Sequence, residues 1–334
     1  MHFFRKTNID FIGKRRLWYV VSIVVTVAGL VFAFARGVEF GIDFAGGTEV
    51  QLKFEKEVAI EDVRGALEKG GFRGAEVKFY GADYSGVLIR VKEEVKESAA
   101  TGGGLSTVET IQQTLASNIP NNKAELRQEQ HIGPKIGAEL QQKGILAVLF
   151  TCIAILIYIA FRFRFIYGVG AVVATLHDVL VAFAFAVIFN GIVPSLNLEM
   201  NSTLLAAFLT IIGFSVNDTV VILDRIREDS KKYKGQDLKT IMNRAVNETL
   251  PRTIITSGTV FLTLVVLFIW GGEVLRGFAF TMLVGVITGS YSSIFISSGI
   301  SYDIIESRKK KGKAIPVETS AARPMKKVAA TVEP

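Results

Sequence analysis

Six apolar stretches constrain this chain more than any other feature of its sequence. A helix needs about 20 apolar residues to cross a hydrocarbon core about 30 Å thick. Half of the 334 residues are hydrophobic and only 21% are charged. The six stretches are residues 17–35, 145–161, 165–189, 203–223, 253–270 and 278–300. The sequence therefore predicts a polytopic α-helical membrane protein with six transmembrane helices.

Lysine and arginine side chains gather on one side of these predicted helices. Short segments that carry many such residues stay in the cytoplasm, whereas acidic residues have little influence. Twenty-three lysine and arginine residues lie in the N-terminal segment, in the links after the second and fourth stretches and in the tail. The links on the other side, residues 190–202 and 271–277, hold only Arg276. Both termini are therefore expected in the cytoplasm, and the long insert after the first helix is expected on the opposite side.

The first apolar stretch has a second interpretation as a cleaved signal peptide. Its last residues, Ala33, Phe34 and Ala35, resemble the small-residue pattern of a cleavage site. A run of 19 apolar residues is longer than the roughly 7 to 15 of a signal core, and its removal would leave one terminus on the wrong side. An uncleaved anchor is the favoured interpretation.

The expected division of the chain follows from these helices. It comprises a cytoplasmic N-terminus (1–16), a first transmembrane helix (17–35), an extracytoplasmic α+β domain (36–144), transmembrane helices two to six (145–302) and a basic, disordered cytoplasmic tail (303–334). The pI near 9.3 does not indicate a nucleic-acid partner, because the positive excess lies in the cytoplasmic segments. The single cysteine, Cys152, excludes an intrachain disulfide.

Between residues 36 and 144 the pattern changes to that of a soluble fold. Apolar residues alternate as in strands at 50–54, 77–79 and 87–91, and they recur at helical spacing over 60–67. After a linker at Gly102–Gly104, Ser106 and Glu109 have capping-box spacing ahead of a second helix, which an extended segment at 124–131 follows. The resulting order β-α-β-β-α-β is that of a ferredoxin-like sandwich.

Ionisable residues inside the predicted helices are the main candidates for function. A charge within the bilayer costs a few kcal/mol on insertion scales, so such a residue is a functional hypothesis by default. Asp178, preceded by His177, lies near the centre of the third stretch, and Asp218, preceded by Asn217, lies in the fourth. Arg252 opens the fifth stretch on the side where Asp218 lies.

Asp218 and Arg252 are predicted to meet if the fourth and fifth helices pack together. Desolvation favours the neutral form of a buried carboxyl group, and a nearby cation favours its charged form. Asp218 is therefore expected to take a proton from one side and release it to the other, with Arg252 as counter-charge and Asn217 as polar neighbour. A static ion pair explains these positions equally well, and for His177 a structural hydrogen bond between helices is favoured.

Covalent chemistry finds little support in the sequence. There is no GxxxxGK[ST] phosphate loop, and residues 45–48 are better explained as a tight turn. Asp218 lies in GFSVND, without the Gly-x-Gly-Asp loop of an intramembrane aspartyl protease. With three histidines and one cysteine, neither a metal site nor another cofactor is expected.

Several motifs together resemble a known family. They are FGIDFAGGTEVQL after the first helix, IGPKIGAELQQKGI before the second, HDV at 177, GFSVNDTVVILDRIRE at 213 and LPRTIITSGT at 250. These segments resemble SecF, the smaller of the paired SecD and SecF subunits of the bacterial Sec translocase, within the resistance-nodulation-division superfamily. The resemblance extends to about Asp303.

The resemblance implies a partner and a mechanism. It implies pairing with SecD into a pseudo-symmetric twelve-helix unit of the bacterial inner membrane, work with the SecYEG translocon and YajC, and contact with the unfolded exported polypeptide. Proton-motive force would drive this export. The proton-pathway aspartate and arginine of the family match Asp218 and Arg252, and the HDV stretch matches His177 and Asp178. Two rival functions stay open, a non-conducting scaffold of the translocon and an exporter of small molecules or lipids, and sodium is an alternative to protons.

Overall fold

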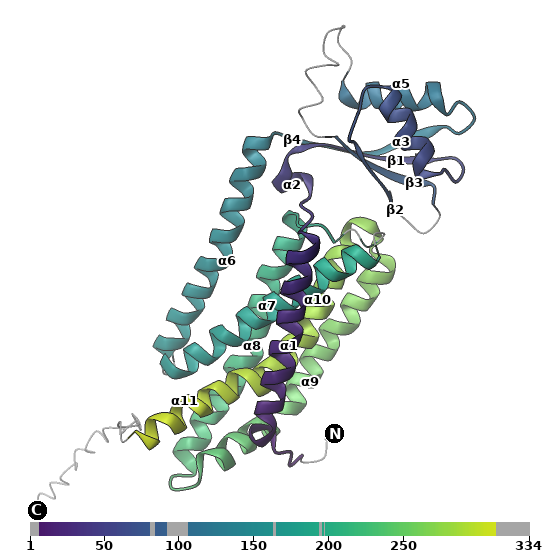
Figure 1. Cartoon of the computed structure of the whole chain (residues 1–334). Helices are drawn as coiled ribbons and strands as arrows, with labels where there is room; N and C mark the ends of the chain where they lie inside the picture. The colour runs from purple at the N-terminus through teal and green to yellow at the C-terminus, as the bar shows by residue number, and fades with distance from the viewer. Residues whose placement is uncertain are drawn as a thin grey trace, which may run out of the picture.

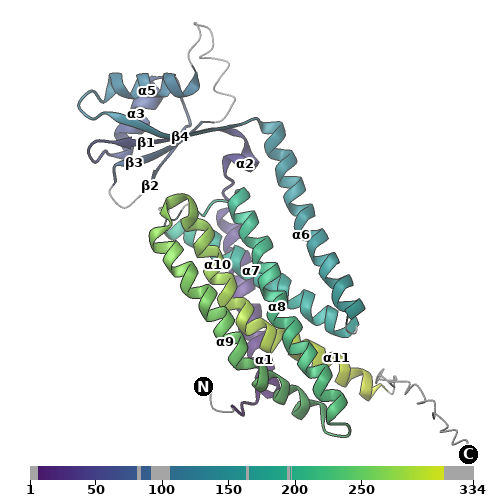
Figure 2. The ribbon, with the colours of Figure 1, turned by 180° about the vertical axis from the view of Figure 1, so that it is seen from behind.

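A bundle of long helices and a small α+β domain at one end of it make up the protein. The structure is a computed structural model that describes residues 7–80, 84–91, 106–162, 165–193, 196 and 198–311. The α+β domain lies at the end of the bundle opposite the start of α1 (Phe11–Arg36) and the end of α11 (Ser298–Lys310) (Figures 1 and 2). The predicted linker at residues 102–104 and residues 312–334 of the predicted tail lie outside the described residues. The prediction of disorder is wrong for residues 303–310, which continue the last helix.

In the part of the chain that the structure describes, six helical spans are long and apolar enough to cross a membrane, and they form the bundle. Their bounds are α1 (Phe11–Arg36), α6 (Pro134–Arg162), α7 (Phe165–Ile192), α8 (Ser202–Lys232), α9 (Leu238–Trp270) and a last span made of α10 (Gly272–Ser292), η3 (Ser293–Ser297) and α11 (Ser298–Lys310). The prediction of six transmembrane helices is confirmed. Most of these helices run beyond their apolar stretches, because charged residues continue the helix once its apolar part has ended.

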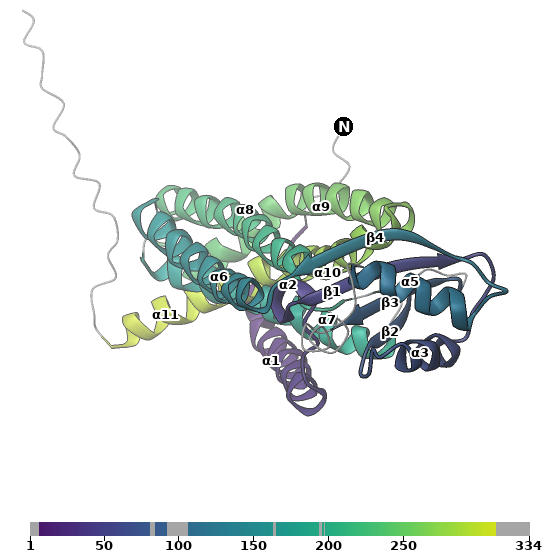
Figure 3. The ribbon, with the colours of Figure 1, turned by 90° about the horizontal axis from the view of Figure 1, so that it is seen from above.

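Helix packing in the bundle depends on small residues. The last span is the most buried, and α1 and α6 are among the least buried; seen from above, these two stand at the edge of the bundle (Figure 3). At the contact of α1 with α7, a Cβ added to Gly29 would lie 2.0 Å from the Cβ of Ala184. Close approach of backbones at small residues is a common way for helices to associate in lipid.

The α+β domain has the element order that the sequence predicts. Its elements are β1 (Gly47–Phe54), α3 (Ile60–Lys69), β2 (Glu76–Tyr80), β3 (Gly86–Val91), α5 (Thr107–Asn118) and β4 (Ala124–Ile132). The strands form one antiparallel sheet in the order β2-β3-β1-β4. The β-α-β-β-α-β ferredoxin-like prediction is confirmed, including the capping box of Ser106 and Glu109 at the start of α5.

The two faces of this sheet have different chemistry. One face forms the domain core with α3 and α5, from the buried residues Val50, Leu52, Phe54, Val63, Leu67, Ile89, Ile111 and Leu115. Successive side chains of a strand point to opposite faces, so Glu49, Gln51 and Arg90 lie on the other face. That polar face is turned toward the membrane helices (Figure 1).

A short helix, α2 (Ile42–Ala45), connects α1 to the domain. Two glycines follow it, Gly46 with φ 74° and Gly47 with φ 128°. Both angles fall in the region that glycine adopts readily and other residues avoid. These glycines make the turn predicted at residues 45–48 and direct the chain into β1.

Candidate functional site

Asp178 is the centre of a buried polar cluster between α7, α8 and α10. Its side chain is 0% exposed. The hydroxyl groups of Ser215 and Ser292 donate hydrogen bonds to its Oδ2 at 2.6 and 2.7 Å, and the Nδ1 of His177 lies 3.1 Å from its Oδ1. Polar groups buried this far inside a bundle are expected to be paired, and those of Asp178 are. Three helices are therefore joined through one carboxyl group.

The cluster continues toward α1. The Nε2 of His177 lies 3.1 Å from the hydroxyl oxygen of Tyr291, which is 3.5 Å from the hydroxyl of Ser22 on α1. The π-helical turn η3 follows directly after Ser292. Such turns occur frequently at functional sites. His177, Asp178, Ser215, Tyr291 and Ser292 are called the Asp178 cluster below.

Asp218 lies in a separate contact, between α8 and α9. It is 3% exposed. The hydroxyl of Ser257 donates a hydrogen bond to its Oδ2 at 3.2 Å, and that of Thr256 donates to its Oδ1 at 3.5 Å. Both bonds are longer than the usual 2.5 to 3.0 Å, roughly, of O–H···O bonds. The carboxyl group of Asp218 is thus held loosely by α9.

Arg252 and Asn217 lie near Asp218 without a hydrogen bond or ion pair to it among the described residues. Among the ion pairs of the described residues there is none between Asp218 and Arg252, and the side chains of Arg252 and Asn217 are exposed. A Cβ added to Gly213, one turn before Asn217, would meet nothing within 4 Å. One face of α8 and α9 is therefore left open beside Asp218.

Helix α8 connects the two carboxyl groups. Ser215, which bonds Asp178, and Asp218 are three residues apart, so they share one side of the helix. Gly289 of α10 lies beside this contact, and a Cβ added there would be at ordinary van der Waals distances, 3.4 Å from the Cβ of Ser215 and 3.7 Å from the Oδ2 of Asp178. A displacement of α8 would change the surroundings of both aspartates together.

A second polar site joins the α+β domain to the start of α8. Arg90 on β3 and Glu199 in the loop before α8 form an ion pair, and their side chains are 5% and 2% exposed. Glu49 and Glu76 also contact the Arg90 guanidinium, at 2.9 and 3.3 Å. The second oxygen of Glu199 accepts a hydrogen bond from Lys78 on β2 at 2.7 Å, and Lys78 also bonds Glu39 at 2.6 Å. These six residues are called the junction below.

The charges of the junction stabilise one another. Burial alone would lower the pKa of the Arg90 guanidinium, but the carboxylates of Glu199 and Glu49 outweigh burial and raise it above its ordinary value. The pKa of Lys78 is raised in the same way, because Glu199 and Glu39 outweigh its desolvation. Desolvation favours the neutral form of Glu39, yet Lys78 holds its pKa below the ordinary value. All three groups are therefore charged at neutral pH.

Backbone and side-chain bonds reinforce the junction. The N–H of Met200 donates to the carbonyl of Glu39, and the N–H of Gly41 donates to the carbonyl of Met200, both at 2.9 Å. Asp43 on α2 accepts hydrogen bonds from the Ser202 backbone N–H at 2.8 Å and from Gln130 of β4 at 3.0 Å. Asp43 therefore binds the first residue of α8 to the edge strand of the sheet.

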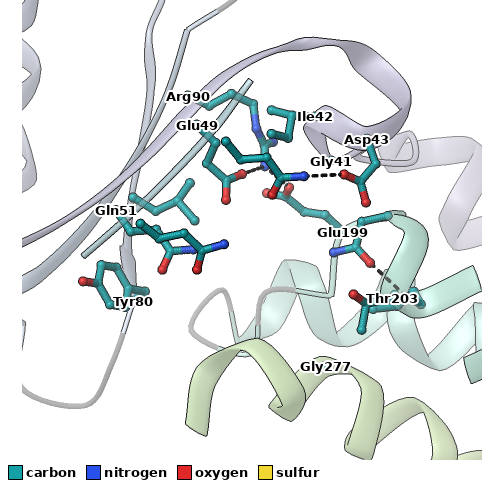
Figure 4. A pocket seen from close by; sticks show the side chains of 15 residues that line it. Gly41, Ile42, Asp43, Glu49, Gln51, Tyr80, Arg90, Glu199, Thr203 and Gly277 are labelled. Atoms are coloured by element: carbon teal, nitrogen blue, oxygen red, sulfur yellow. Dashed lines mark hydrogen bonds and ion pairs between the residues drawn. The ribbon is translucent and has the colours of Figure 1, made fainter. Parts of the chain in front are cut away.

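A polar cavity of about 110 Å³ lies at this junction. Figure 4 shows Arg90 and Glu49 on one side of it and Asp43 and Glu199 on the other. Gln51, Gln128, Gln130 and Asn201 complete a lining of amide and charged groups. The junction has one signal in the sequence, because Glu199 is the sole charged residue in the 190–202 link, but that signal does not indicate Arg90 as its partner. Nowhere in the described part of the chain do three or more His, Cys, Asp and Glu side chains group as metal ligands would.

Together, the fold and these sites define a class: a six-span membrane protein with a ferredoxin-like domain inserted after its first span and attached to the start of its fourth. The sequence matches the family described as protein export membrane protein SecD/SecF, C-terminal, over residues 110–307, and the SecD/SecF GG motif over residues 31–58. Curated relatives named protein translocase subunit SecF include that of Calditerrivibrio nitroreducens, 41% identical over 91% of this chain and 96% of the relative, and that of Rhodothermus marinus, 40% identical over 91% and 96%. The chain belongs to the SecF subunits of the SecD/SecF family.

Solved structures agree with this family. The crystal structure of SecDF, a translocon-associated membrane protein from Thermus thermophilus, matches with a TM-score of 0.75 and 32% identity over 89% of this chain. SecDF in a super-membrane-facing form matches with a TM-score of 0.65 and 32% identity. This chain spans 39% and 40% of the lengths of those two chains. Both solved proteins are SecDF, and together with the SecF relatives this supports SecD as partner of this chain.

Proposed function

We propose that this chain is the SecF half of an export machine in which proton uptake and release at Asp218 moves α8 and, through the junction, the α+β domain. No covalent reaction is part of this function. The proton-motive force would supply the energy, and the moved domain would act on the unfolded polypeptide. The proposal assigns the proton site to Asp218 and supporting roles to Arg252, Asn217, Asp178 and His177.

One observation carries the proposal: α8 has an intramembrane carboxyl group at its middle and the domain at its start. Asp218 and the Asp178 partner Ser215 lie in its central turns, and Asp43 bonds its first residue, Ser202. Glu199, three residues before the helix, forms the buried pair with Arg90 of the domain. Since a helix is a stiff element, a shift caused at Asp218 would reach the sheet.

The surroundings of Asp218 suit a group that changes its protonation state. The hydroxyl groups of its two partners can each donate or accept a hydrogen bond, so they can bond both the ionised and the protonated carboxyl group. Arg252 lies one turn before Thr256 on α9, near enough along the helix for its long side chain to reach toward the carboxylate when α9 shifts. In this proposal Arg252 pairs with the ionised form and is released when Asp218 takes a proton.

The open face of α8 and α9 supports a partner on that side. Gly213, Asn217 and Arg252 are exposed there, although small and polar residues in spans usually face other helices rather than lipid. We assign this face to SecD, with which the chain would form a twelve-helix unit that works beside the SecYEG translocon and YajC. The lysine and arginine distribution supports cytoplasmic termini and a domain outside the inner membrane.

The test is precursor export in cells whose only copy of this chain carries Asp218→Asn. Asparagine keeps the shape and removes the proton site. Asp224→Asn on the same helix is the matched control, because its side chain is 58% exposed and lies 3.9 Å from Arg162 at the surface of the bundle. We expect export to fall to the level of cells without the protein for Asp218→Asn only, while abundance and co-purification of SecD stay normal.

Normal export by Asp218→Asn would refute the proton site and favour a non-conducting scaffold. The small size of the described domain speaks against a small-molecule or lipid exporter, which needs a larger domain to enclose its cargo. Sodium in place of protons would be revealed if export followed the sodium gradient and not the pH gradient.

A further inference from the structure

An apolar groove runs along the bundle on the side away from the open face of α8 and α9. Its walls come from α1, α7 and the last span, and its volume is about 480 Å³, within the range of about 300 to 1,000 Å³ that ligand pockets occupy. It extends over two turns of α1, from Tyr19 to Val27. Seen from above, α1 stands on the side of the bundle opposite α8 and α9 (Figure 3). The proposed SecD partner therefore leaves this groove free.

The chemistry of the groove walls selects an acyl chain. The lining consists largely of Ile23, Val27, Val173, Leu176, Leu180, Ile296 and Ile300. Ile23 and Val27 are 61% and 51% exposed, so the groove opens sideways to the hydrocarbon core. A headgroup finds little to bond within it, whereas a lipid tail buries further CH₂ groups.

A charged hollow adjoins the groove at its end. Ile300 lines the groove and also lines a second hollow on α11, together with Asp303, Ile304, Ser307, Arg308 and Lys311. Arg308 lies eight residues after Ile300, about 12 Å along the helix. This end of α11 points away from the α+β domain (Figure 1). An apolar groove thus leads into a surface that carries exposed basic groups.

Charge complementarity defines the headgroup. Among the described residues that line this hollow, Asp303 is the one carboxylate. It is already paired with Arg15 of α1 at 2.7 Å and accepts a further bond from Tyr19 at 3.2 Å. Arg308 and Lys311 are left to give the hollow a positive charge. Basic residues next to a transmembrane helix attract anionic lipids, and Arg in particular suits phosphate.

We propose that one anionic phospholipid binds here, with an acyl chain in the groove between α1, α7 and the last span and its phosphate on Arg308 and Lys311. The chain would cover the side of His177 that faces the groove. The His177 side chain is 10% exposed, and it is the member of the Asp178 cluster that lines the groove. A bound lipid tail would therefore complete the apolar cover of that cluster on the α1 side.

The experiment measures lipids retained by the purified full-length chain in native mass spectrometry. The probes are phosphatidylglycerol and phosphatidylcholine with identical acyl chains, added as mixed micelles. Val27→Trp fills the groove, and Val31→Trp, one turn further on α1 and 61% exposed, is its control outside the groove. Arg308→Glu with Lys311→Glu removes the phosphate site, and Lys309→Glu with Lys310→Glu makes the same charge change outside the hollow.

We expect wild type to retain one phosphatidylglycerol with a preference of at least about tenfold over phosphatidylcholine, given the attraction of two basic residues. Val27→Trp and the Arg308 and Lys311 double variant should lose that retention, whereas both controls keep it. Equal retention of the two lipids by wild type, or equal losses in variants and controls, would overturn the proposal. If Val27→Trp does not fold, the site is mapped in wild type with phosphatidylglycerol that carries a photoreactive tail. Labelling of residues 173–180 supports the groove as the site, and labelling elsewhere refutes it.

Discussion

The junction between the domain and α8 gives the sharpest quantitative prediction, through the substitution Glu199→Gln. Glutamine keeps the shape and one acceptor oxygen, but it removes the charge that faces Arg90 and Lys78. Breaking a buried ion pair costs about 3 to 5 kcal/mol when the remaining charge has no other partner. Here Arg90 keeps Glu49 at 2.9 Å and Lys78 keeps Glu39 at 2.6 Å. The expected loss is therefore nearer the value of one hydrogen bond to a charged group, about 2 kcal/mol.

Amide hydrogen exchange measures this loss where it occurs. The N–H groups of Gly41 and Met200 bond across the junction, so they exchange when the domain and the α8 loop separate. A loss of about 2 kcal/mol corresponds to a roughly 25-fold larger open population, because 1.4 kcal/mol is a factor of ten. We expect exchange of these two amides in purified chain to accelerate by about that factor, while the amides of the domain core stay unchanged.

The matched control is Glu125→Gln at an exposed pair of the same sheet. Glu125 lies 2.9 Å from Arg127, and the two side chains are 69% and 52% exposed. Exposed pairs contribute about 0 to 1 kcal/mol. An acceleration below about threefold for Glu199→Gln, or one equal to that of the control, would show that the buried pair does not hold the domain on α8.

Three further predictions concern stability, each measured as the midpoint of thermal unfolding in detergent. Gly29→Val forces side-chain atoms onto Ala184, where an added Cβ would lie only 2.0 Å away, and should cost about 1 to 3 kcal/mol. Asp43→Ala removes the acceptor at the start of α8 and should cost about 1 kcal/mol. Asp10 has its pKa lowered to about 2 from 3.8, first by its hydrogen bond to Lys239. A lowered pKa contributes stability above pH 3.8 that is lost as pH falls toward 2, and Asp10→Asn should abolish this part of the pH dependence.

Controls for these three predictions come from the same chain. Gly213→Val should leave the isolated chain unchanged, because an added Cβ there meets nothing within 4 Å; equal losses from Gly29→Val and Gly213→Val would refute the packing argument. Glu125→Ala, at an exposed strand position, should cost less than Asp43→Ala. The Asp10 contribution is small because the side chain is 51% exposed and solvent screens it, and an identical acid transition in Asp10→Asn would contradict it.

The local periodicity of apolar residues was sufficient to predict most of the fold. It could not predict which side chains far apart in the chain pair with one another. Apolar runs gave the six spans, and the alternation at Val50, Leu52 and Phe54 gave a strand, because these patterns are set by neighbours along the chain. Arg90 and Glu199 are 109 positions apart, and the alternation over residues 87–91 places Arg90 on the face opposite the core without indicating what it contacts. Only the packing of the domain onto α8 reveals their pairing.

The candidate site was predicted only in part, because the contacts of its side chains also depend on long-range packing. The sequence identified Asp178 and Asp218 as buried groups. A carboxyl group in an apolar stretch is costly to place in lipid, so it almost always faces the interior of the bundle. Their hydroxyl partners, such as Ser215 and Ser257, had no distinctive pattern, because serine occurs throughout membrane helices. The expected contact between Asp218 and Arg252 depends on the rotation of α9, which places Ser257 rather than Arg252 beside the carboxyl group.

The central claim, that Asp218 is a proton site that works through α8, is tested most directly by proton flux. The chain and its SecD partner are reconstituted into liposomes that hold a pH-sensitive dye, and a pH gradient is imposed on wild type, Asp218→Asn and Asp224→Asn at equal protein density. The account predicts flux above that of protein-free liposomes for wild type and Asp224→Asn, and background flux for Asp218→Asn. Wild-type flux through the Asp218→Asn complex would contradict it.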